Sequence, residues 1–194
     1  MTPSIAKYVF LAALIVFCAI RFPREWKGRK VAVARSEYGW REHFRVAAST
    51  WGLAIIPIIA ATTRLLRGAD LAFRPWVAWI GAAVFVLALW IFWSAHRELG
   101  RNFSPTLVVR EQHTLVTGGI YGYMRHPMYA AFWLWVVAQA LLLQNWVVAI
   151  GGVVGWGILF FDRIGQEEAM MRETFGEQYD AFARRTKRLV PWVY

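Results

Sequence analysis

The chain has 194 residues, of which 58% are hydrophobic, and it carries a formal net charge of +10. This is more apolar than an ordinary soluble domain, and twelve Trp with thirteen Phe suit the aromatic belts of membrane–water interfaces. The single cysteine, Cys18, excludes an internal disulfide and a cysteine-rich metal site. The sequence therefore favours one integral membrane domain.

Five apolar stretches follow one another along the chain and are predicted to be membrane-spanning helices. The first lacks the basic leader and cleavage site of a signal peptide, so we expect it to be retained. The first three approach the ~20 residues that cross a ~30 Å hydrocarbon core. The last two are shorter and only Gln144-Asn145 separates them, which predicts a tight helical hairpin; one broken or re-entrant helix is the alternative. The stretches are 4–20, 46–63, 75–95, 128–143 and 146–161.

The basic residues are distributed unevenly between the predicted loops. If all five stretches cross, one side of the membrane carries eighteen of the 22 Lys and Arg, in segments 21–45, 96–127 and 162–194. Since cytoplasmic loops are enriched in Lys and Arg, this bias predicts cytoplasmic loops, a cytoplasmic C-terminus and an N-terminus outside. It also accounts for the positive charge without a nucleic-acid partner.

The C-terminal stretch 163–189 has a different pattern. Its apolar residues are spaced by three or four positions, with charged residues between them, which predicts an amphipathic helix. Gly176 is expected to interrupt this helix and Pro191 to end it. The helix would lie on the membrane surface or fold back over the core. The fold class predicted overall is an all-α membrane protein with about five spans, a final helical hairpin and a cytoplasmic amphipathic helix.

Two polar clusters, 111–129 and 161–179, flank the predicted hairpin. A hairpin returns the chain to the side that it left, so His126 and Arg163 should lie near one another. An ion pair between Arg163 and Glu167, four residues apart, is the simpler interpretation of that pair. For His126 the simpler interpretation is a surface cap or an interfacial histidine. Alternatively, His126-Pro127 begins a helix whose free N–H groups suit an anionic ligand.

Several familiar chemistries are not supported by the sequence. There is no P-loop, no G-x-G-x-x-G segment after a strand and no serine in a nucleophile elbow. The four histidines lack the spacing of metal ligands, so no metal site is predicted. What remains is a site at the membrane edge with two cations, two carboxylates and aromatic walls.

The order of motifs resembles a known family. The segment HTLVTGGIYGYMRHPMY, a short apolar hairpin and then DRIGQEEAMMRETFGEQYDAFARRTKRLVPW resemble the isoprenylcysteine carboxyl methyltransferase family, which is related to membrane phospholipid methyltransferases. The resemblance covers residues 100–192 and implies a membrane enzyme that uses S-adenosylmethionine and releases S-adenosylhomocysteine. Residues 1–95 would then form three N-terminal spans, and residues 96–194 the cofactor-binding catalytic half of a single domain.

The resemblance also implies roles for particular residues. Arg163 would face the methyl acceptor, and Glu167 would bind the cofactor; these two are the candidate catalytic residues. Arg125 and Glu168 would be their neighbours in the cofactor site. The full set of expected cofactor-binding residues is His113, Thr114, Leu115, Val116, Tyr121, Arg125, His126, Pro127, Met128, Tyr129, Glu167 and Glu168.

The implied reaction is methylation of the carboxylate of a lipid-like acceptor, such as a prenylcysteine, that enters from the membrane. The alternatives are methylation of a phospholipid or another amine, with Glu167 or Glu168 as base, and a membrane reductase with a nicotinamide cofactor. A non-enzymatic lipid-binding or assembly protein is a further alternative. Membrane lipids are the expected surroundings, and no obligate protein partner is expected.

Overall fold

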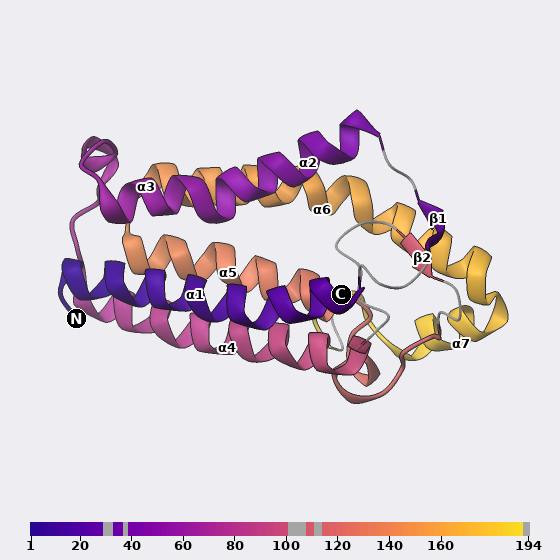
Figure 1. The fold of residues 1–194 in the computed structure, drawn as a ribbon. Helices are drawn as coiled ribbons and strands as arrows, with labels where there is room; N and C mark the ends of the chain where they lie inside the picture. Colours follow the sequence, from indigo (N-terminus) through magenta and orange to yellow (C-terminus); the bar gives the residue numbers. More distant parts are fainter. Residues whose placement is uncertain (29–32, 37–38, 101–107, 111–113, 192–194) are drawn as a thin grey trace.

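The computed structural model describes residues 1–28, 33–36, 39–100, 108–110 and 114–191. Figure 1 shows long helices lying side by side, with a small sheet and a short last helix at one end of the bundle. The helices are α1 (Pro3–Gly28), α2 (Trp40–Thr50), α3 (Ile56–Thr62), α4 (Pro75–Leu99), α5 (Pro127–Leu143), α6 (Trp146–Phe175) and α7 (Glu177–Arg185).

Shorter elements connect these helices. A π-helical turn, η1 (Trp51–Ile55), joins α2 to α3 without a break, and 3₁₀ turns occur at Arg67–Ala69 and Gly119–Gly122. Strands β1 (Val33–Ser36) and β2 (Val108–Arg110) form an antiparallel pair. The helical architecture was predicted from the sequence, whereas these two strands were not.

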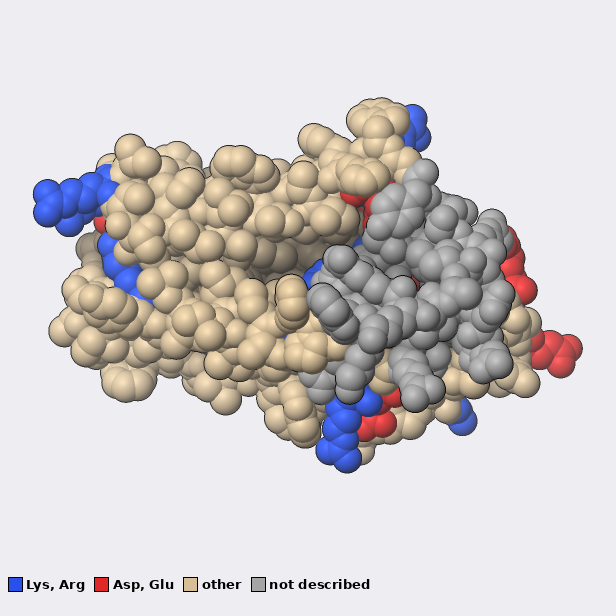
Figure 2. Space-filling view, viewed as in Figure 1, with Lys and Arg blue, Asp and Glu red and all other residues tan. Residues whose placement is uncertain are grey.

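Four helical segments have the length and apolar composition that crossing a membrane requires. They are Pro3–Pro23, Trp40–Thr62, Pro75–Leu99 and Trp146–Phe175. Helix α5 is also apolar but has 17 residues. In Figure 2 the visible middle of the bundle is covered by uncharged side chains, and the charged ones gather toward its ends. The chain is therefore an integral membrane protein.

Aromatic rings fill the centre of the bundle. Phe10 of α1, Phe85 of α4 and Trp135 of α5 are almost completely buried. The rings of Phe85 and Trp135 meet edge-on with centroids 4.7 Å apart, which is a favoured aromatic geometry. These contacts hold α1, α4 and α5 together as a single packed layer.

The predicted hairpin between α5 and α6 is confirmed. Gln144 has a φ of +47° and ends α5, and the Asn145 side chain accepts a hydrogen bond from the Val148 amide at 3.1 Å, which caps α6. The amide groups also anchor the turn: Gln144 donates to the Arg74 carbonyl at 2.9 Å, and Asn145 donates to Asp70 at 2.7 Å. The turn is thus fixed to the loop that precedes α4.

The π-helical turn between α2 and α3 packs closely against α6. A Cβ atom on Gly52 would lie 2.2 Å from the Gly151 carbonyl oxygen, so only glycine fits there. Two side chains of α5 bond the turn's carbonyls: Trp135 donates to Leu53 at 3.2 Å, and Gln139 donates to Gly52 at 3.0 Å. Such bonds satisfy backbone groups that a π-helical turn presents inside a membrane bundle.

The C-terminal region differs in detail from the sequence-based expectation. Residues 163–175 continue α6, which runs for 30 residues, rather than beginning a separate helix. The chain then turns at Gly176, whose φ of +53° is readily adopted by glycine. Helix α7 ends at Arg185, before Pro191. The change from apolar to charged residues near position 162 therefore marks the end of the apolar surface and not the end of the helix.

Helix α7 folds back over the protein. Its Tyr179 and Phe182 side chains are buried in a cluster with Ala95 of α4 and Tyr121. This part of the predicted apolar stripe therefore packs against the protein.

We expect Gly52→Ala to destabilise the protein, because the new methyl group would overlap a backbone oxygen that cannot rotate away. Overpacking of this kind costs about 1–3 kcal/mol. Thermal unfolding in detergent measures the effect. The control is Gly165→Ala on α6, where a Cβ meets nothing within 4 Å. This change should instead stabilise the helix by about 0.5–1 kcal/mol. Equal melting temperatures for the two variants would contradict the glycine-packed crossing.

Candidate functional site

The two polar clusters flanking the hairpin meet at one end of the bundle. Figure 1 shows the start of α5, the later part of α6 and α7 at that same end. The Nε2 atom of His126, at the start of α5, lies 3.4 Å from Oε1 of Glu168 on α6. The predicted proximity of residues 125–126 to the charged part of α6 is therefore confirmed.

Glu168 is the centre of this junction and is 1% exposed. Its carboxylate accepts hydrogen bonds from Arg125 Nε at 3.1 Å and from Arg188 Nη2 at 2.8 Å, with His126 as a third neighbour. A buried carboxylate is costly unless it is paired, and here it is paired from two sides. Glu168 thus ties α6 to the start of α5 and to the C-terminal segment.

Arg125 bonds to several of the protein's own groups. Besides Glu168, its guanidinium donates to the Ala183 carbonyl at 2.9 Å and to the Thr186 carbonyl. These are carbonyls at the C-terminal end of α7, where a cation is favourable. Its contacts in this structure anchor α7; the place in the cofactor site that the resemblance implied for Arg125 stays a prediction.

The segment after α7 runs beside the start of α5. The backbone amide of Arg125 donates to the Lys187 carbonyl at 2.7 Å, and that of His126 donates to the Arg188 carbonyl at 2.9 Å. Sequence reasoning did not select Arg188. A basic residue near the end of a charged segment carries no local sign of pairing with a carboxylate twenty positions earlier.

His126, Tyr129 and Glu167 form a second contact group beside Glu168. The His126 and Tyr129 rings are stacked, with centroids 5.3 Å apart and an interplanar angle of 9°. The Tyr129 hydroxyl donates a hydrogen bond to Glu167 Oε2. Tyr129 is buried, whereas Glu167 is half-buried. Glu167 is therefore fixed by α5 while part of its side chain remains accessible.

Apolar and aromatic side chains line the neighbouring region. Leu115, Val116 and Met128 pack partly buried against Tyr121, so these four expected cofactor residues lie in one cluster. Burial and, next, the charge of Glu167 raise the pKa of Tyr121 well above its usual value. Its phenol therefore stays protonated and able to donate a hydrogen bond at neutral pH.

Tyr179 of α7 belongs to the same cluster. Among the described residues its buried hydroxyl has no hydrogen-bond partner. Burial, followed by the charge of Glu168, raises the pKa of Tyr179 to about 12. A neutral hydroxyl within an aromatic and apolar wall is a group that a polar ligand atom would satisfy.

Three other residues were expected to bind the cofactor: Pro127, Thr114 and His113. Helix α5 begins at Pro127, as predicted, and His126 is its N-cap without a side-chain capping bond. Thr114 is exposed. His113 lies outside the described residues.

Arg163 faces a different neighbour from Glu167. Its side chain is almost buried, and its Nη1 atom lies 3.5 Å from Oε1 of Glu42 on α2. Glu42 is 4% exposed and was missed by sequence reasoning, which began the second span at residue 46. Helix α2 begins six residues earlier, at Trp40, and this places Glu42 against α6.

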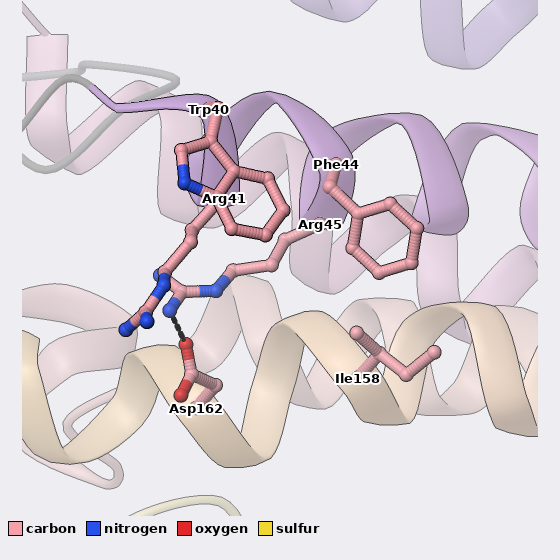
Figure 3. Close-up of a pocket in the computed structure, with 6 residues that line it drawn as sticks. All are labelled: Trp40, Arg41, Phe44, Arg45, Ile158 and Asp162. Atoms are coloured by element: carbon pink, nitrogen blue, oxygen red, sulfur yellow. Dashed lines mark ion pairs between the residues drawn. The ribbon is translucent and has the colours of Figure 1, made fainter.

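A pocket of about 500 Å³ lies between α2 and α6 (Figure 3). The Arg45 side chain of α2 forms an ion pair with Asp162 of α6 beside it. None of the expected site residues lines this pocket, but Arg45 also lies 3.5 Å from Glu42, which connects the pocket to Arg163. The pocket is lined by Trp40, Arg41, Phe44, Arg45, Ile158 and Asp162.

These observations define a class of protein: a helical membrane protein with a polar site at one end, formed by α2, α5, α6 and α7 and walled by aromatic residues. Comparison with known proteins specifies the family. The profile of the isoprenylcysteine carboxyl methyltransferase (ICMT) family matches residues 79–173. The chain is 32% identical over 142 residues to protein-S-isoprenylcysteine O-methyltransferase A of Arabidopsis thaliana, covering 72% of each chain. The chain belongs to the ICMT family.

Two other relatives extend the comparison. Protein-S-isoprenylcysteine O-methyltransferase B of Arabidopsis thaliana is 36% identical over 121 residues, and the match spans 61% of each protein. A probable protein-S-isoprenylcysteine O-methyltransferase of Oryza sativa subsp. indica is 25% identical over 190 residues, or 96% of each.

A solved structure shares the fold. The eukaryotic intramembrane Ras methyltransferase ICMT superposes with a TM-score of 0.62 at 20% identity. The match covers all of this chain and 69% of that one.

We expect Glu168→Ala to lower the free energy of unfolding by about 1–3 kcal/mol, because the partly buried Arg125 and Arg188 would lose a charge-assisted hydrogen-bond partner. Arg125 would also lose one of the groups that orient it toward α7. Thermal unfolding in detergent, with limited proteolysis of the C-terminal segment, measures both effects. Glu177→Ala, an exposed carboxylate on α7, is the control and should cost no more than about 1 kcal/mol. An unchanged melting temperature for Glu168→Ala would show that the junction is not held by this carboxylate.

Proposed function

We propose that this protein methylates the carboxylate of a prenylcysteine-like lipid acceptor with S-adenosylmethionine as methyl donor. The observation that carries the proposal is the junction of the two motif clusters, with His126, Tyr129 and Glu167 in contact at one end of the bundle, in a chain of the ICMT family. The relatives described above are named as isoprenylcysteine O-methyltransferases, which favours this reaction over amine methylation or a nicotinamide-dependent reduction.

The donor side of the site is assigned to α5, α7 and the segment before α5. The apolar cluster around Tyr121 and Met128 suits an adenine ring, and the half-buried carboxylate of Glu167 suits ribose hydroxyls or an ammonium group. The buried, unsatisfied hydroxyl of Tyr179 supports the fit of a polar ligand there. His126 and the helix start at Pro127 would hold the carboxylate of the donor's methionine part.

The acceptor side is assigned to Arg163. Its guanidinium suits a carboxylate, which it can orient with paired hydrogen bonds. When bound, the donor supplies a methyl group activated by a sulfonium; transfer to a carboxylate oxygen forms an ester and leaves S-adenosylhomocysteine, with no proton to remove. The residues of the site therefore have to align the reactants and exclude water, and neither Glu167 nor Glu168 has to act as a base.

The acceptor's lipid tail is assigned to the membrane-facing surface of the bundle. Figure 2 shows a hollow on the visible face, between the layer of α2 and α3 and the layer of α1 and α4, with basic atoms visible near one end. A lipid tail lying in such a hollow would bring its polar head toward the end of the bundle that carries Arg163. The water-soluble donor would enter from the aqueous side of that same end.

We further propose that all five apolar helices cross the membrane, with the N-terminus outside and the site in the cytoplasm. The distribution of Lys and Arg supports this orientation, because eighteen of 22 fall on the side of the site. Helix α5, with 17 residues, is at the short end of the range that spans a bilayer. Residues 96–194 would supply the donor side, with α2 completing the acceptor side.

We expect purified protein to transfer a radiolabelled methyl group from S-adenosylmethionine to a farnesylated or geranylgeranylated cysteine with a free carboxylate. The label should be released by mild base, since it is an ester. An amidated prenylcysteine is the matched control and should accept nothing. Label in a base-stable form on a phospholipid panel would identify an amine methyltransferase, and no transfer to any acceptor would contradict the proposal.

In sealed inside-out vesicles externally added donor should be used, and in right-side-out vesicles it should not.

We expect Glu167→Gln and Arg163→Gln to separate the two sides of the site. Glu167→Gln should weaken S-adenosylhomocysteine binding by roughly tenfold, the loss of about one charged hydrogen bond. Arg163→Gln should leave that binding within about twofold and lower turnover by ~10²-fold, because the acceptor loses its orienting cation. Calorimetric binding and the ester assay measure the two effects. The assignment is wrong if Arg163→Gln abolishes cofactor binding in folded protein, or if both variants behave as wild type.

A further inference from the structure

A row of alternating charges crosses the contact between α2 and α6. Asp162 pairs with Arg45, Arg45 lies 3.5 Å from Glu42, and Glu42 lies 3.5 Å from Arg163. The outer members, Asp162 and Arg45, line the pocket in Figure 3. The inner members, Glu42 and Arg163, are almost completely buried. Glu42 therefore lies between a pocket on the bundle surface and the arginine assigned to the acceptor.

The burial of the Glu42 carboxylate lowers the stability of the folded state in the arrangement observed. Both of its carboxylate oxygens are buried, and within the part of the chain that the structure describes neither has a hydrogen-bond partner. Its two ion pairs, at 3.5 Å, are long for charge-assisted contacts. Replacing such buried pairs by apolar residues is often neutral or stabilising, so packing alone gives little reason for a carboxylate here.

The contact between α2 and α6 does not depend on this carboxylate. Farther along the same contact, Gly52 lies against Gly151 and Gly155 so closely that no side chain fits. Helix α2 and its π-helical turn are therefore positioned by backbone packing, and Glu42 is presented to Arg163 from a rigid support. A charge on a rigid support is what orients a neighbouring guanidinium.

We propose that Glu42 is a positioning residue for the methyl acceptor. It holds one edge of the Arg163 guanidinium through Nη1, so that the acceptor carboxylate meets the guanidinium in one orientation. It also offsets part of the Arg163 charge, so that the acceptor carboxylate is oriented without being bound too tightly to react. The assignment rests on the proposed function of Arg163, and it extends the acceptor side to a helix outside the region matched by the family profile.

The test is Glu42→Gln, which keeps the shape of the side chain and removes its charge. Turnover at saturating acceptor should fall by ~10- to 100-fold, the penalty for a misoriented reactant. The KM for the prenylcysteine acceptor should stay the same or fall. Arg163 keeps its charge in this variant, and the Glu42 carboxylate no longer competes with the acceptor carboxylate for it. S-adenosylhomocysteine binding should remain within twofold of wild type. Asp180→Asn, a carboxylate-to-amide change in an exposed ion pair of α7, is the matched control and should leave all three quantities unchanged.

A double-mutant cycle distinguishes positioning from a general structural role. If Glu42 acts through Arg163, Glu42→Gln should cause no further loss of turnover when Arg163 is already glutamine. An equal loss in both backgrounds, a raised acceptor KM, or weakened S-adenosylhomocysteine binding would overturn the proposal.

The four proteins of this cycle are the wild type, Glu42→Gln, Arg163→Gln and the double variant. They are also to be compared by thermal unfolding, which requires no substrate. Non-additive melting temperatures would show that Glu42 and Arg163 are coupled. If wild-type protein methylates no carboxylate acceptor, the proposed function fails, and the positioning role fails with it even where the melting temperatures show coupling. If wild type is active and Glu42→Gln is equally active, only the positioning role fails.

Discussion

The arrangement of the site depends on one buried carboxylate, Glu168. It accepts hydrogen bonds from Arg125 and Arg188 and lies beside His126. The carboxylate itself is 1% exposed and would not be stable there without these partners, because a buried charge without a partner is strongly unfavourable. Through this carboxylate, three segments far apart in sequence are joined: the start of α5, the later part of α6 and the segment after α7. The neighbouring Glu167 is then left for other partners, since the structural pairing is already supplied by Glu168.

Helix α6 separates two chemical environments. Arg163 and Glu167 are four residues apart, close to one face of the helix, yet Arg163 contacts Glu42 on α2 and Glu167 contacts Tyr129 on α5. The glycine-packed crossing sets the position of α2, and the polar turn at Gln144 and Asn145 sets the direction of α5. A reaction between a water-soluble donor and a lipid requires two such environments to meet at one point, and a single continuous helix provides both.

The sequence predicted those parts of the structure that follow from local patterns. Apolar run lengths predicted the hairpin, and the hairpin alone required His126 and Arg163 to lie at the same end. Glu42 was not predictable in this way, because it stands in a basic segment typical of a membrane flank, and its contact with Arg163 spans 121 positions. The contacts of Arg125 were not predictable for a similar reason. Its guanidinium donates to backbone carbonyls at the end of α7, about sixty residues later. Every residue has a backbone carbonyl, so the sequence does not indicate which one is bound.

The continuity of α6 also bears on how the site works. Sequence patterning placed a boundary near residue 162, where apolar residues give way to charged ones, but the helix continues to Phe175. Arg163, Glu167 and Glu168 are therefore carried on a helix that packs against α2, α3 and α5. The turn before this helix is fixed to the loop before α4. Groups on a rigid helix are held more accurately than groups on a loop. In the proposed reaction, methyl transfer to a carboxylate involves no proton transfer by the protein, so accuracy of placement is the main contribution that the roles proposed for these residues require.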